Sequence, residues 1–332
     1  MKINVFMATA GDQWEKEVLK NMGAGIQTWI NNQGRHQYPL QGVRLGRWAQ
    51  YEVPKDVDIM DYVYAETYEP CDVAIMFGSW KTREKGTHIT RGQIATQARR
   101  FLCIETALLG RRTDKENTHF RIGVNGYLNQ DAEWPEFDAQ VGNTRLARLG
   151  VCWPGWQNNP DGHIVVCLQL PGDASLRGAD INDWAWRAIN QIRSVSDRPI
   201  TVRCHPLVSA RAFESHMELV ARVTLDQIAD VSFSDGAQRS WHEDIAGAWC
   251  TVTYTSGLAI DSVLCGIPTV ACDPGNFAWP ISSHDPREVM DPKCESEHLV
   301  IQWMQQLAQC QWSLDEMRSG EAWQAYLSLV QP

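Results

Sequence analysis

Short apolar runs alternate with amphipathic stretches along the first part of the chain. Residues 3–8, 71–78 and 101–104 are mainly apolar, as expected of strands that are buried on both faces. Between them, 14–29 and 92–100 carry apolar residues at helical spacing. This alternation of strands and helices predicts a parallel sheet.

The same alternation restarts after residue 160. The strands that it predicts are 163–168, 199–204, 249–254 and 269–272. The helices that it predicts are 181–195, 211–222, 258–264 and 296–329. In between, residues 123–160 are rich in Trp, Pro, Gly and Asn, which is typical of loops and of a connection between domains.

We therefore expect an α/β fold with two Rossmann-like domains that face one another across a cleft. The predicted domains are residues 1–160 and 161–295. Residues 296–332 are expected to form C-terminal helices that pack back on the domains. A length of 332 residues suits two domains of ordinary size.

Charge is distributed unevenly between the halves. Residues 1–150 hold 19 basic and 18 acidic residues, whereas the rest hold 11 basic and 22 acidic ones. A net charge of −10 excludes a general nucleic-acid coat protein. The arginines between residues 81 and 112 form either a local basic face or an ordinary solvated helix face.

The ten cysteines include no Cys-x-x-Cys pair and no cluster at zinc spacing. Several lie within apolar strand-like runs, which predicts buried, reduced thiols and a reducing compartment. The first residues are too short and too weakly charged for a signal peptide, and no apolar run approaches the length of a membrane span. We expect a cytoplasmic protein.

A polar segment follows the predicted strand 163–168. It contains Gln169, then a Pro-Gly turn with Gly172, then Asp173. Ligands bind at the carboxyl ends of strands in open parallel sheets, so this segment is a candidate site. The alternative is a simple turn in which Asp173 caps a helix.

His205 and Pro206 follow the next predicted strand, 199–204. An imidazole at this position could donate a hydrogen bond to a phosphate oxygen or act as an acid. A histidine of purely structural role is the alternative.

A third polar segment, Thr255-Ser256-Gly257, separates strand 249–254 from helix 258–264. Free N–H groups at a helix start suit a phosphate, and glycine allows a ligand to approach the backbone. Asp261, one turn into the helix, could reach a ribose hydroxyl. Ordinary capping of the helix by Ser and Thr is the alternative.

Together, the motifs around Gln169, His205 and Ser256-Gly257, with the later Gly266-Ile267-Pro268, resemble the donor half of the capsular-polysaccharide β-Kdo transferases. The resemblance covers about residues 160–275 and implies the two-Rossmann arrangement called GT-B. It implies a nucleotide-sugar donor as co-substrate, and no tightly bound metal or other cofactor. The donor-binding residues that we expect are Gln169, Gly172, Asp173, His205, Pro206, Thr255, Ser256, Gly257 and Asp261. The family pattern leads us to expect a glutamate where Asp261 stands.

The N-terminal half is similar to phage and bacterial relatives of this family, through segments 77–81, 104–106 and 121–129. Glycosyl transfer needs a carboxylate near the sugar carbon. Glu105, at the end of a buried strand, and Asp12, after the first strand, are the catalytic candidates. A helix cap or an ion pair with an arginine is the alternative for each. The acceptor-binding residues that we expect are Trp80, Lys81, Arg121 and Asn125.

These observations favour a glycosyltransferase that acts on a hydroxyl acceptor. The acceptor is either a surface polysaccharide or a hydroxymethylated base in phage DNA, which would have to be flipped out of the duplex. A nucleotide-sugar epimerase and a non-catalytic nucleotide-sugar-binding protein are the alternative functions. The sequence does not indicate the oligomeric state, the sugar or the stereochemical course.

Overall fold

The computed structural model describes residues 2–7, 13–33, 61–63, 68–81, 87–110, 118–206 and 216–330. The chain divides into two compact units, and each is described by itself. Unit 1 comprises Met1–Tyr127, Asp131–Leu149 and Gln305–Pro332, and unit 2 comprises Leu128–Gln130 and Gly150–Met304. The sequence-based boundaries lay at residues 160 and 295, whereas the units change near residues 150 and 304.

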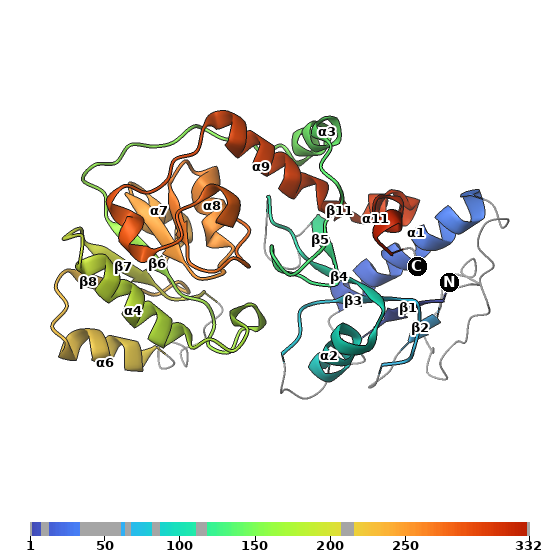
Figure 1. Ribbon diagram of the computed structural model, residues 1–332, viewed down its shortest axis with the longest axis horizontal. Coiled ribbons are helices and arrows are strands. Elements are labelled where there is room, and N and C mark those ends of the chain that lie inside the picture. The colour runs from blue at the N-terminus through green and yellow to red at the C-terminus, as the bar shows by residue number, and fades with distance from the viewer. Residues whose placement is uncertain are drawn as a thin grey trace. The chain divides into compact units, whose positions relative to one another are not determined.

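The sheet of unit 1 has six strands in the order β11-β5-β4-β3-β1-β2 (Figure 1). Neighbours from β2 to β4 are parallel, whereas β5 is antiparallel to both β4 and β11. The strands are β1 (Ile3–Phe6), β2 (Asp61–Val63), β3 (Val73–Phe77), β4 (Arg100–Thr106), β5 (His119–Val124) and β11 (Gln311–Ser313). The predicted parallel sheet is thus present, with an antiparallel edge that the apolar runs did not indicate.

Helices cover both faces of this sheet. One face packs against α1 (Gln13–Gln33), α10 (Leu314–Ser319) and α11 (Glu321–Val330), which share one buried apolar cluster with the strands. On the other side lies α2 (Thr87–Gln97), with Ile94 fully buried (Figure 1). A further helix, α3 (Ala139–Leu149), lies within the segment that was predicted to be loops. That prediction was wrong because the apolar face of α3 is narrow, with only Gly142, Arg145 and Leu146 buried.

The C-terminal segment was predicted as one helical stretch, and the structure corrects this. Helix α9 (Glu297–Gln309) ends before β11, and Ser313 then begins α10 with a capping box that includes Glu316. Gly320, at φ +91°, ends α10 in the left-handed conformation that glycine adopts most easily. The sequence pattern that predicted a helix therefore includes a strand, β11, which pairs with β5.

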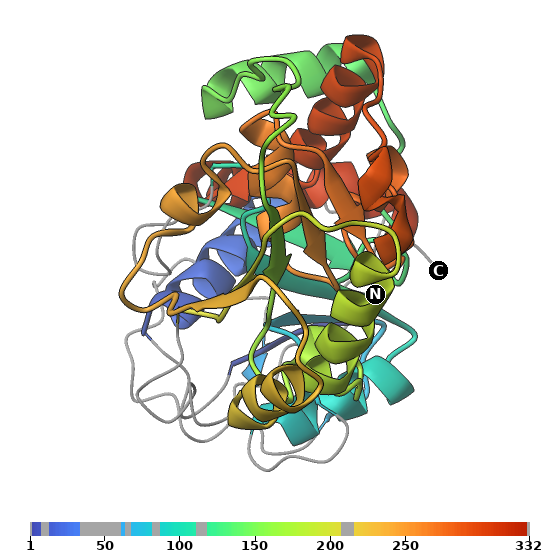
Figure 2. The ribbon, with the colours of Figure 1, turned by 90° about the vertical axis from the view of Figure 1, so that its left-hand side faces the viewer.

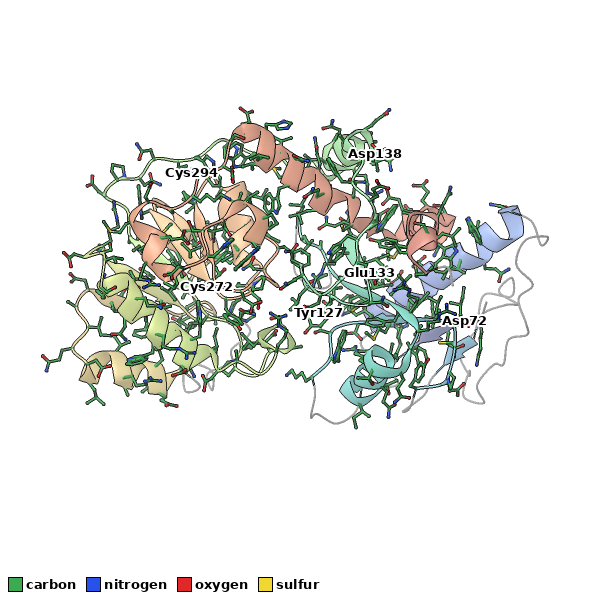
Figure 3. All side chains as sticks on the ribbon, viewed as in Figure 1. Asp72, Tyr127, Glu133, Asp138, Cys272 and Cys294 are labelled. Carbon is green, nitrogen blue, oxygen red and sulfur yellow. The ribbon has the colours of Figure 1, made fainter. Side chains whose placement is uncertain are left out.

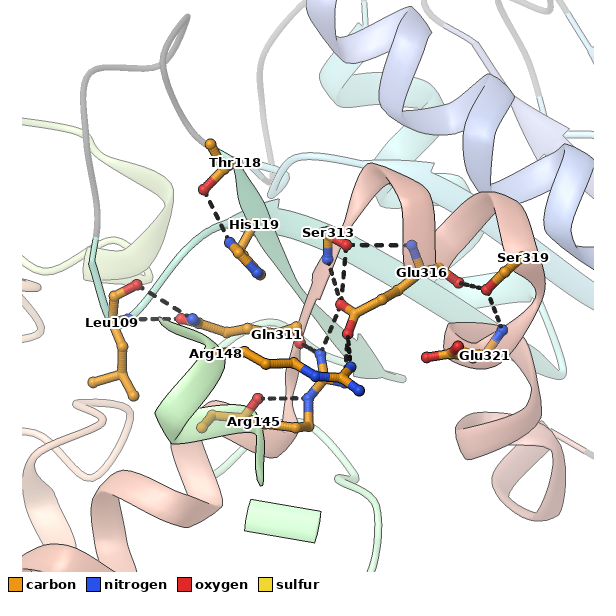
Figure 4. A network of polar contacts seen from close by, with 11 residues as sticks. Leu109, Thr118, His119, Arg145, Arg148, Gln311, Ser313, Glu316, Ser319 and Glu321 are labelled. Atoms are coloured by element: carbon orange, nitrogen blue, oxygen red, sulfur yellow. Dashed lines mark hydrogen bonds and ion pairs between the residues drawn. The ribbon is translucent and has the colours of Figure 1, made fainter. Parts of the chain in front are cut away.

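Polar contacts hold β11 in place within unit 1 (Figure 4). The Gln311 side chain accepts hydrogen bonds from the backbone N–H groups of Leu108 and Leu109, the latter over 2.6 Å. Arg145 is buried and donates to the Gln311 carbonyl and to Glu316, 3.1 Å away. Every buried polar group in this set has a partner, which is the condition for burying it without a large cost.

Unit 2 contains a five-stranded, wholly parallel sheet in the order β10-β9-β6-β7-β8. Its strands are β6 (Ile164–Cys167), β7 (Ile200–Arg203), β8 (Val231–Ser234), β9 (Cys250–Thr253) and β10 (Thr269–Ala271). When these strands are renumbered 1 to 5 along the chain, their order across the sheet is 3-2-1-4-5, as in the first five strands of a Rossmann fold. The four strands predicted for this part of the chain are confirmed, and β8 was missed.

Alternate residues of β6 serve two apolar clusters. Ile164 and Val166 pack with α4 (Ile181–Arg193) and α6 (Met217–Leu225), which lie side by side in Figures 1 and 2. Val165 and Cys167 pack with α7 (Trp241–Ile245) and α8 (Leu258–Leu264) on the opposite face. The described residues of this unit also form three short 3₁₀ helices: η1 (Ala174–Leu176), η2 (Trp279–Ile281) and η3 (Pro286–Met290).

The fold class is therefore confirmed as α/β with two Rossmann-like units. The predicted helix 181–195 corresponds to α4, and the one at 258–264 to α8. The predicted helix 211–222 begins outside the described residues, and its described part belongs to α6. Among the described residues, no helix is both long enough and apolar enough to cross a membrane.

The contact between α1 and α10 depends on a glycine. A Cβ atom on Gly25 would lie 1.6 Å from the carbonyl oxygen of Met317. Gly25→Ala should therefore lower the free energy of unfolding by about 1–3 kcal/mol, the usual cost of overpacking. Gly92→Ala is the matched control, because no atom lies within 4 Å of a Cβ at this helical position. The control should raise stability by about 0.5–1 kcal/mol. Urea unfolding measures both, and equal effects would refute the close approach.

Candidate functional site

Sheet order identifies one edge of unit 2 as the place for a ligand. From β6 the chain continues to β7 and β8 on one side of the sheet, and then returns to β9 and β10 on the other side. The connections that leave β6 and β9 therefore diverge, and in open parallel sheets ligands bind at such a topological switch point. The segments after β6 and β9 are two of the three polar segments predicted from the sequence.

Gln169 joins these two segments. Its side chain is buried; the amide oxygen accepts a hydrogen bond from the Thr255 backbone N–H, and the amide nitrogen donates to the Thr255 hydroxyl, each over 2.9 Å. Residues 86 positions apart are thus fixed together at the switch point. The hydrogen bonds of the Gln169 side chain are internal, so its structural role is to hold the segments that border the site.

Asp173 stabilises the turn after β6. It is the N-cap of η1 and accepts hydrogen bonds from the Ser175 N–H over 2.8 Å and from the Ser175 hydroxyl over 2.5 Å. The Ser175 hydroxyl in turn accepts from Gln169 over 2.6 Å. Gly172 has φ +72°, which a residue with a Cβ adopts only under strain. Asp173 therefore caps a helix, which was the alternative to a role in ligand binding.

The segment after β9 is held in the same way. Thr255 is buried, whereas Ser256, Gly257 and Asp261 are half-buried. The Ser256 hydroxyl accepts a hydrogen bond from the Leu258 N–H over 3.2 Å, so Ser256 contributes to capping α8. Helix α8 has seven residues, and Gly257 has an ordinary helical φ of −61°. The backbone conformation at this position therefore does not itself require a glycine.

His205 and Pro206 lie just beyond β7, the strand next to β6, with His205 half-buried and Pro206 exposed. A second histidine that the sequence did not single out, His216, is fully buried, with its Nδ1 2.6 Å from the Asn182 side-chain oxygen. Burial, together with the nearby His205, lowers the pKa of His216 to about 4. The imidazole of His216 is therefore neutral at neutral pH.

Three further residues at these strand ends were missed by sequence reasoning. Asp273 follows β10 directly after Cys272, which Figure 3 labels, and it forms an ion pair with Arg177. Tyr254 follows β9; burial and the nearby Asp273 carboxylate raise the pKa of Tyr254. The available signal was position alone, since Tyr254 is the last residue of a predicted strand and Asp273 comes directly after another.

In unit 1, the catalytic candidate Glu105 ends β4 beside the end of β3. Its carboxylate accepts a hydrogen bond from the Ser79 N–H over 2.6 Å and lies 3.9 Å from the Arg121 guanidinium on β5. Arg121 also donates to the Thr106 carbonyl over 2.7 Å. The structure thus brings together Glu105 and Arg121, in the ion pair that was the alternative to a catalytic role.

The other acceptor-binding candidates differ in their surroundings. Half-buried Trp80 packs edge-on against Phe101 and Tyr127, the latter labelled in Figure 3. Asn125 has φ +60°, accepts from the Phe101 N–H over 3.2 Å and donates to Glu133 over 2.7 Å, so it forms a tight turn.

Lys81 is half-buried. The second catalytic candidate, Asp12, lies outside the described residues.

Among the residues that the structure describes, no group of three or more His, Cys, Asp or Glu side chains is placed to hold a metal ion.

The Gln169 contacts lead to a stability prediction. Gln169→Ala would leave the buried N–H of Thr255 without its acceptor, which should lower the free energy of unfolding of unit 2 by about 1–3 kcal/mol. Gln157→Ala is the control, since Gln157 is exposed and water can replace its bond to the Cys265 carbonyl. Chemical unfolding followed by tryptophan fluorescence measures both variants. Equal losses would show that Gln169 does not hold the two segments together.

The buried His216 predicts a pH dependence of stability. Its pKa of about 4 in the folded protein lies below the usual 6.5 or so of an unfolded chain, so the unfolded chain takes up a proton first on acidification. The stability due to this group is complete above about pH 6.5 and is lost as the pH falls towards 4. At about 1.4 kcal/mol per pKa unit, the loss approaches 3 kcal/mol.

The test compares urea unfolding between pH 7 and 4.5 for the unchanged protein, His216→Gln and the exposed-site control His298→Gln. The slope of stability against pH should be shallower in His216→Gln and unchanged in the control. The same slope in all three would contradict the burial of a neutral His216.

The chain is similar to solved structures but not to any family model or curated protein. Among solved structures, KpsC of Thermosulfurimonas dismutans, a β-Kdo 2,7 transferase, is similar with a TM-score of 0.48 and 12% sequence identity. The match covers 97% of this chain and 99% of that one.

Proposed function

We propose that this protein is a glycosyltransferase that takes its sugar from a nucleotide-sugar donor. The observation that carries the proposal is the polar edge of unit 2, where the segments after β6 and β9 meet through Gln169 and Thr255 at the switch point of a Rossmann half. Nucleotide ligands bind Rossmann folds at this position. The motif resemblance to β-Kdo transferases supports a sugar nucleotide as the ligand.

The donor's phosphate would be bound by neutral hydrogen-bonding groups at this edge. Ser256 and His205 are half-buried at the ends of neighbouring connections, so each is accessible to a ligand. An imidazole N–H is a suitable donor to a phosphate oxygen. In transfer, the bond between the sugar carbon and the phosphate oxygen breaks, and stabilising the negative charge that develops on the phosphate lowers the barrier.

The acceptor hydroxyl must lose a proton as its oxygen bonds to the sugar carbon. Our proposal gives this role to Glu105, whose carboxylate is held by the Ser79 N–H and the Arg121 guanidinium. A carboxylate held in one orientation is a suitable proton acceptor in general base catalysis. The acceptor is a glycan or a hydroxymethylated base in DNA, and product analysis distinguishes the two.

The test is a thermal-unfolding screen against UDP-, GDP-, CMP- and ADP-linked sugars. It uses the unchanged protein, His205→Ala, and His298→Ala as a control at an exposed position on α9. A ligand at about 100 times its Kd stabilises the folded form by roughly 2.7 kcal/mol, which raises the unfolding midpoint by about 5–10 °C. One nucleotide class should raise the midpoint of the unchanged protein and of the control, and should do so far less in His205→Ala.

The same nucleotide sugar is then incubated with glycan and with hydroxymethylated DNA, and the products are identified by mass spectrometry and chromatography. A glycosylated acceptor supports the transferase, whereas an epimerised sugar nucleotide identifies an epimerase. If no sugar nucleotide raises the midpoint at millimolar concentration, the proposed function is wrong.

A further inference from the structure

Arg177 has an uncommon backbone conformation at the switch point. It is the C-cap of η1, with φ +51° and ψ +33°, in the left-handed region that favours glycine. Gly178 follows with φ +89°. A residue with a Cβ in this region is strained, and such strain concentrates at binding sites. The position therefore suggests that an arginine has a use here beyond forming the turn.

The guanidinium of Arg177 is held by a carboxylate from another strand end. It donates to Asp273, whose same oxygen accepts from the Gly275 N–H over 2.8 Å. The Asp273 side chain is 11% exposed and that of Arg177 is 37% exposed. The carboxylate is thus buried behind a cation that solvent, and hence a ligand, can reach.

Positive charge is scarce in this part of the molecule. Residues 161–186 contain one Lys or Arg, which is Arg177, and residues 250–286 contain none. Beside them, at the end of β7, Arg203 is buried and paired with Asp244. Asp173, Asp261 and Asp273 place three carboxylates on the same connections. Within residues 161–186 and 250–286, an anionic ligand would meet these carboxylates and the single positive charge of Arg177.

On these grounds we propose that Arg177 binds the phosphate of the donor nucleotide, and that Asp273 positions its guanidinium. This inference rests on the proposed function and adds to it the residue that provides charge complementarity. The planar guanidinium fork matches two phosphate oxygens at once. Arg177 is a binding residue in this account, and Asp273 is a positioning residue.

A purely structural role for the ion pair makes a different prediction. A pair with one partner more than a third exposed contributes little to folding stability. Arg177→Gln should therefore leave the unfolding midpoint of the ligand-free protein nearly unchanged. If the ion pair only holds two loops together, Arg177→Gln should instead lower the unfolding midpoint and leave the affinity for the nucleotide unaltered.

The experiment is a calorimetric titration of the full chain with CMP, UDP, GDP and ADP, and with the corresponding nucleosides. The variants are Arg177→Gln, Arg177→Lys, Asp273→Asn and the control Arg187→Gln. Arg187 is 62% exposed and also pairs with an aspartate, so the control removes a comparable surface charge. Unfolding midpoints of all ligand-free variants are measured alongside.

For the nucleotide that binds the unchanged protein, Arg177→Gln should bind at least about tenfold more weakly, as expected for the loss of a charged hydrogen bond. Arg177→Lys should bind the nucleotide more tightly than Arg177→Gln but less tightly than the unchanged protein. The control Arg187→Gln should bind it as tightly as the unchanged protein. Asp273→Asn should weaken nucleotide binding by a smaller factor. Nucleoside affinity should be unaltered in every variant, because a nucleoside lacks the phosphate.

Two results would overturn the inference. If the unchanged protein binds a nucleotide and Arg177→Gln binds it equally well, Arg177 is not the phosphate ligand and the proposed function still stands. If the unchanged protein binds no nucleotide at millimolar concentration, both this inference and the proposed function are wrong.

Discussion

The hydrogen bonds between the Gln169 amide and Thr255 fix the edge of unit 2 on which the proposed chemistry depends. A parallel sheet places the carboxyl ends of its strands at one edge but leaves the connecting segments free to diverge. Gln169 limits that divergence, because one side chain satisfies a backbone N–H and a hydroxyl of the other segment. Asp173 and Ser175 extend the same set of bonds. The position of Ser256, which we assign to ligand binding and which follows Thr255 directly, depends on this constraint.

The fold was predictable where burial alone decides the structure. Strands such as Ile164–Cys167 are apolar on both faces, and this signal is local and strong. Val231–Ser234 was missed because this edge strand alternates polar and apolar residues and is only partly buried. Gln311–Ser313 was missed because its partner, β5, lies almost 200 residues earlier in the chain. Pairing over such a distance leaves no trace in local periodicity.

The candidate site, like the fold, could be predicted from the sequence only in part. The carboxyl ends of β6, β7 and β9 could be recognised from the sequence because polar residues follow apolar runs there. The partners of those residues could not, since Gln169–Thr255 and Arg177–Asp273 join segments 86 and 96 residues apart. Asn125 is predicted to bind the acceptor, and the structure adds a part in a turn, through its φ of +60° and its bond to Glu133. Residue type alone did not indicate this conformation and pairing.

Unit 1 is interrupted in the chain by unit 2, and this has a consequence for biosynthesis. Its sheet is completed by β11, and its apolar cluster by α10 and α11, all of which follow unit 2 in sequence. A ribosome makes the whole of unit 2 while one face of the first sheet still lacks two of its covering helices, α10 and α11. Domains that emerge intact can fold during translation, whereas unit 1 must wait for residues up to Val330. The nascent first half therefore exposes apolar surface for most of the time that the chain is being made, and it is the part for which chaperone binding would matter most.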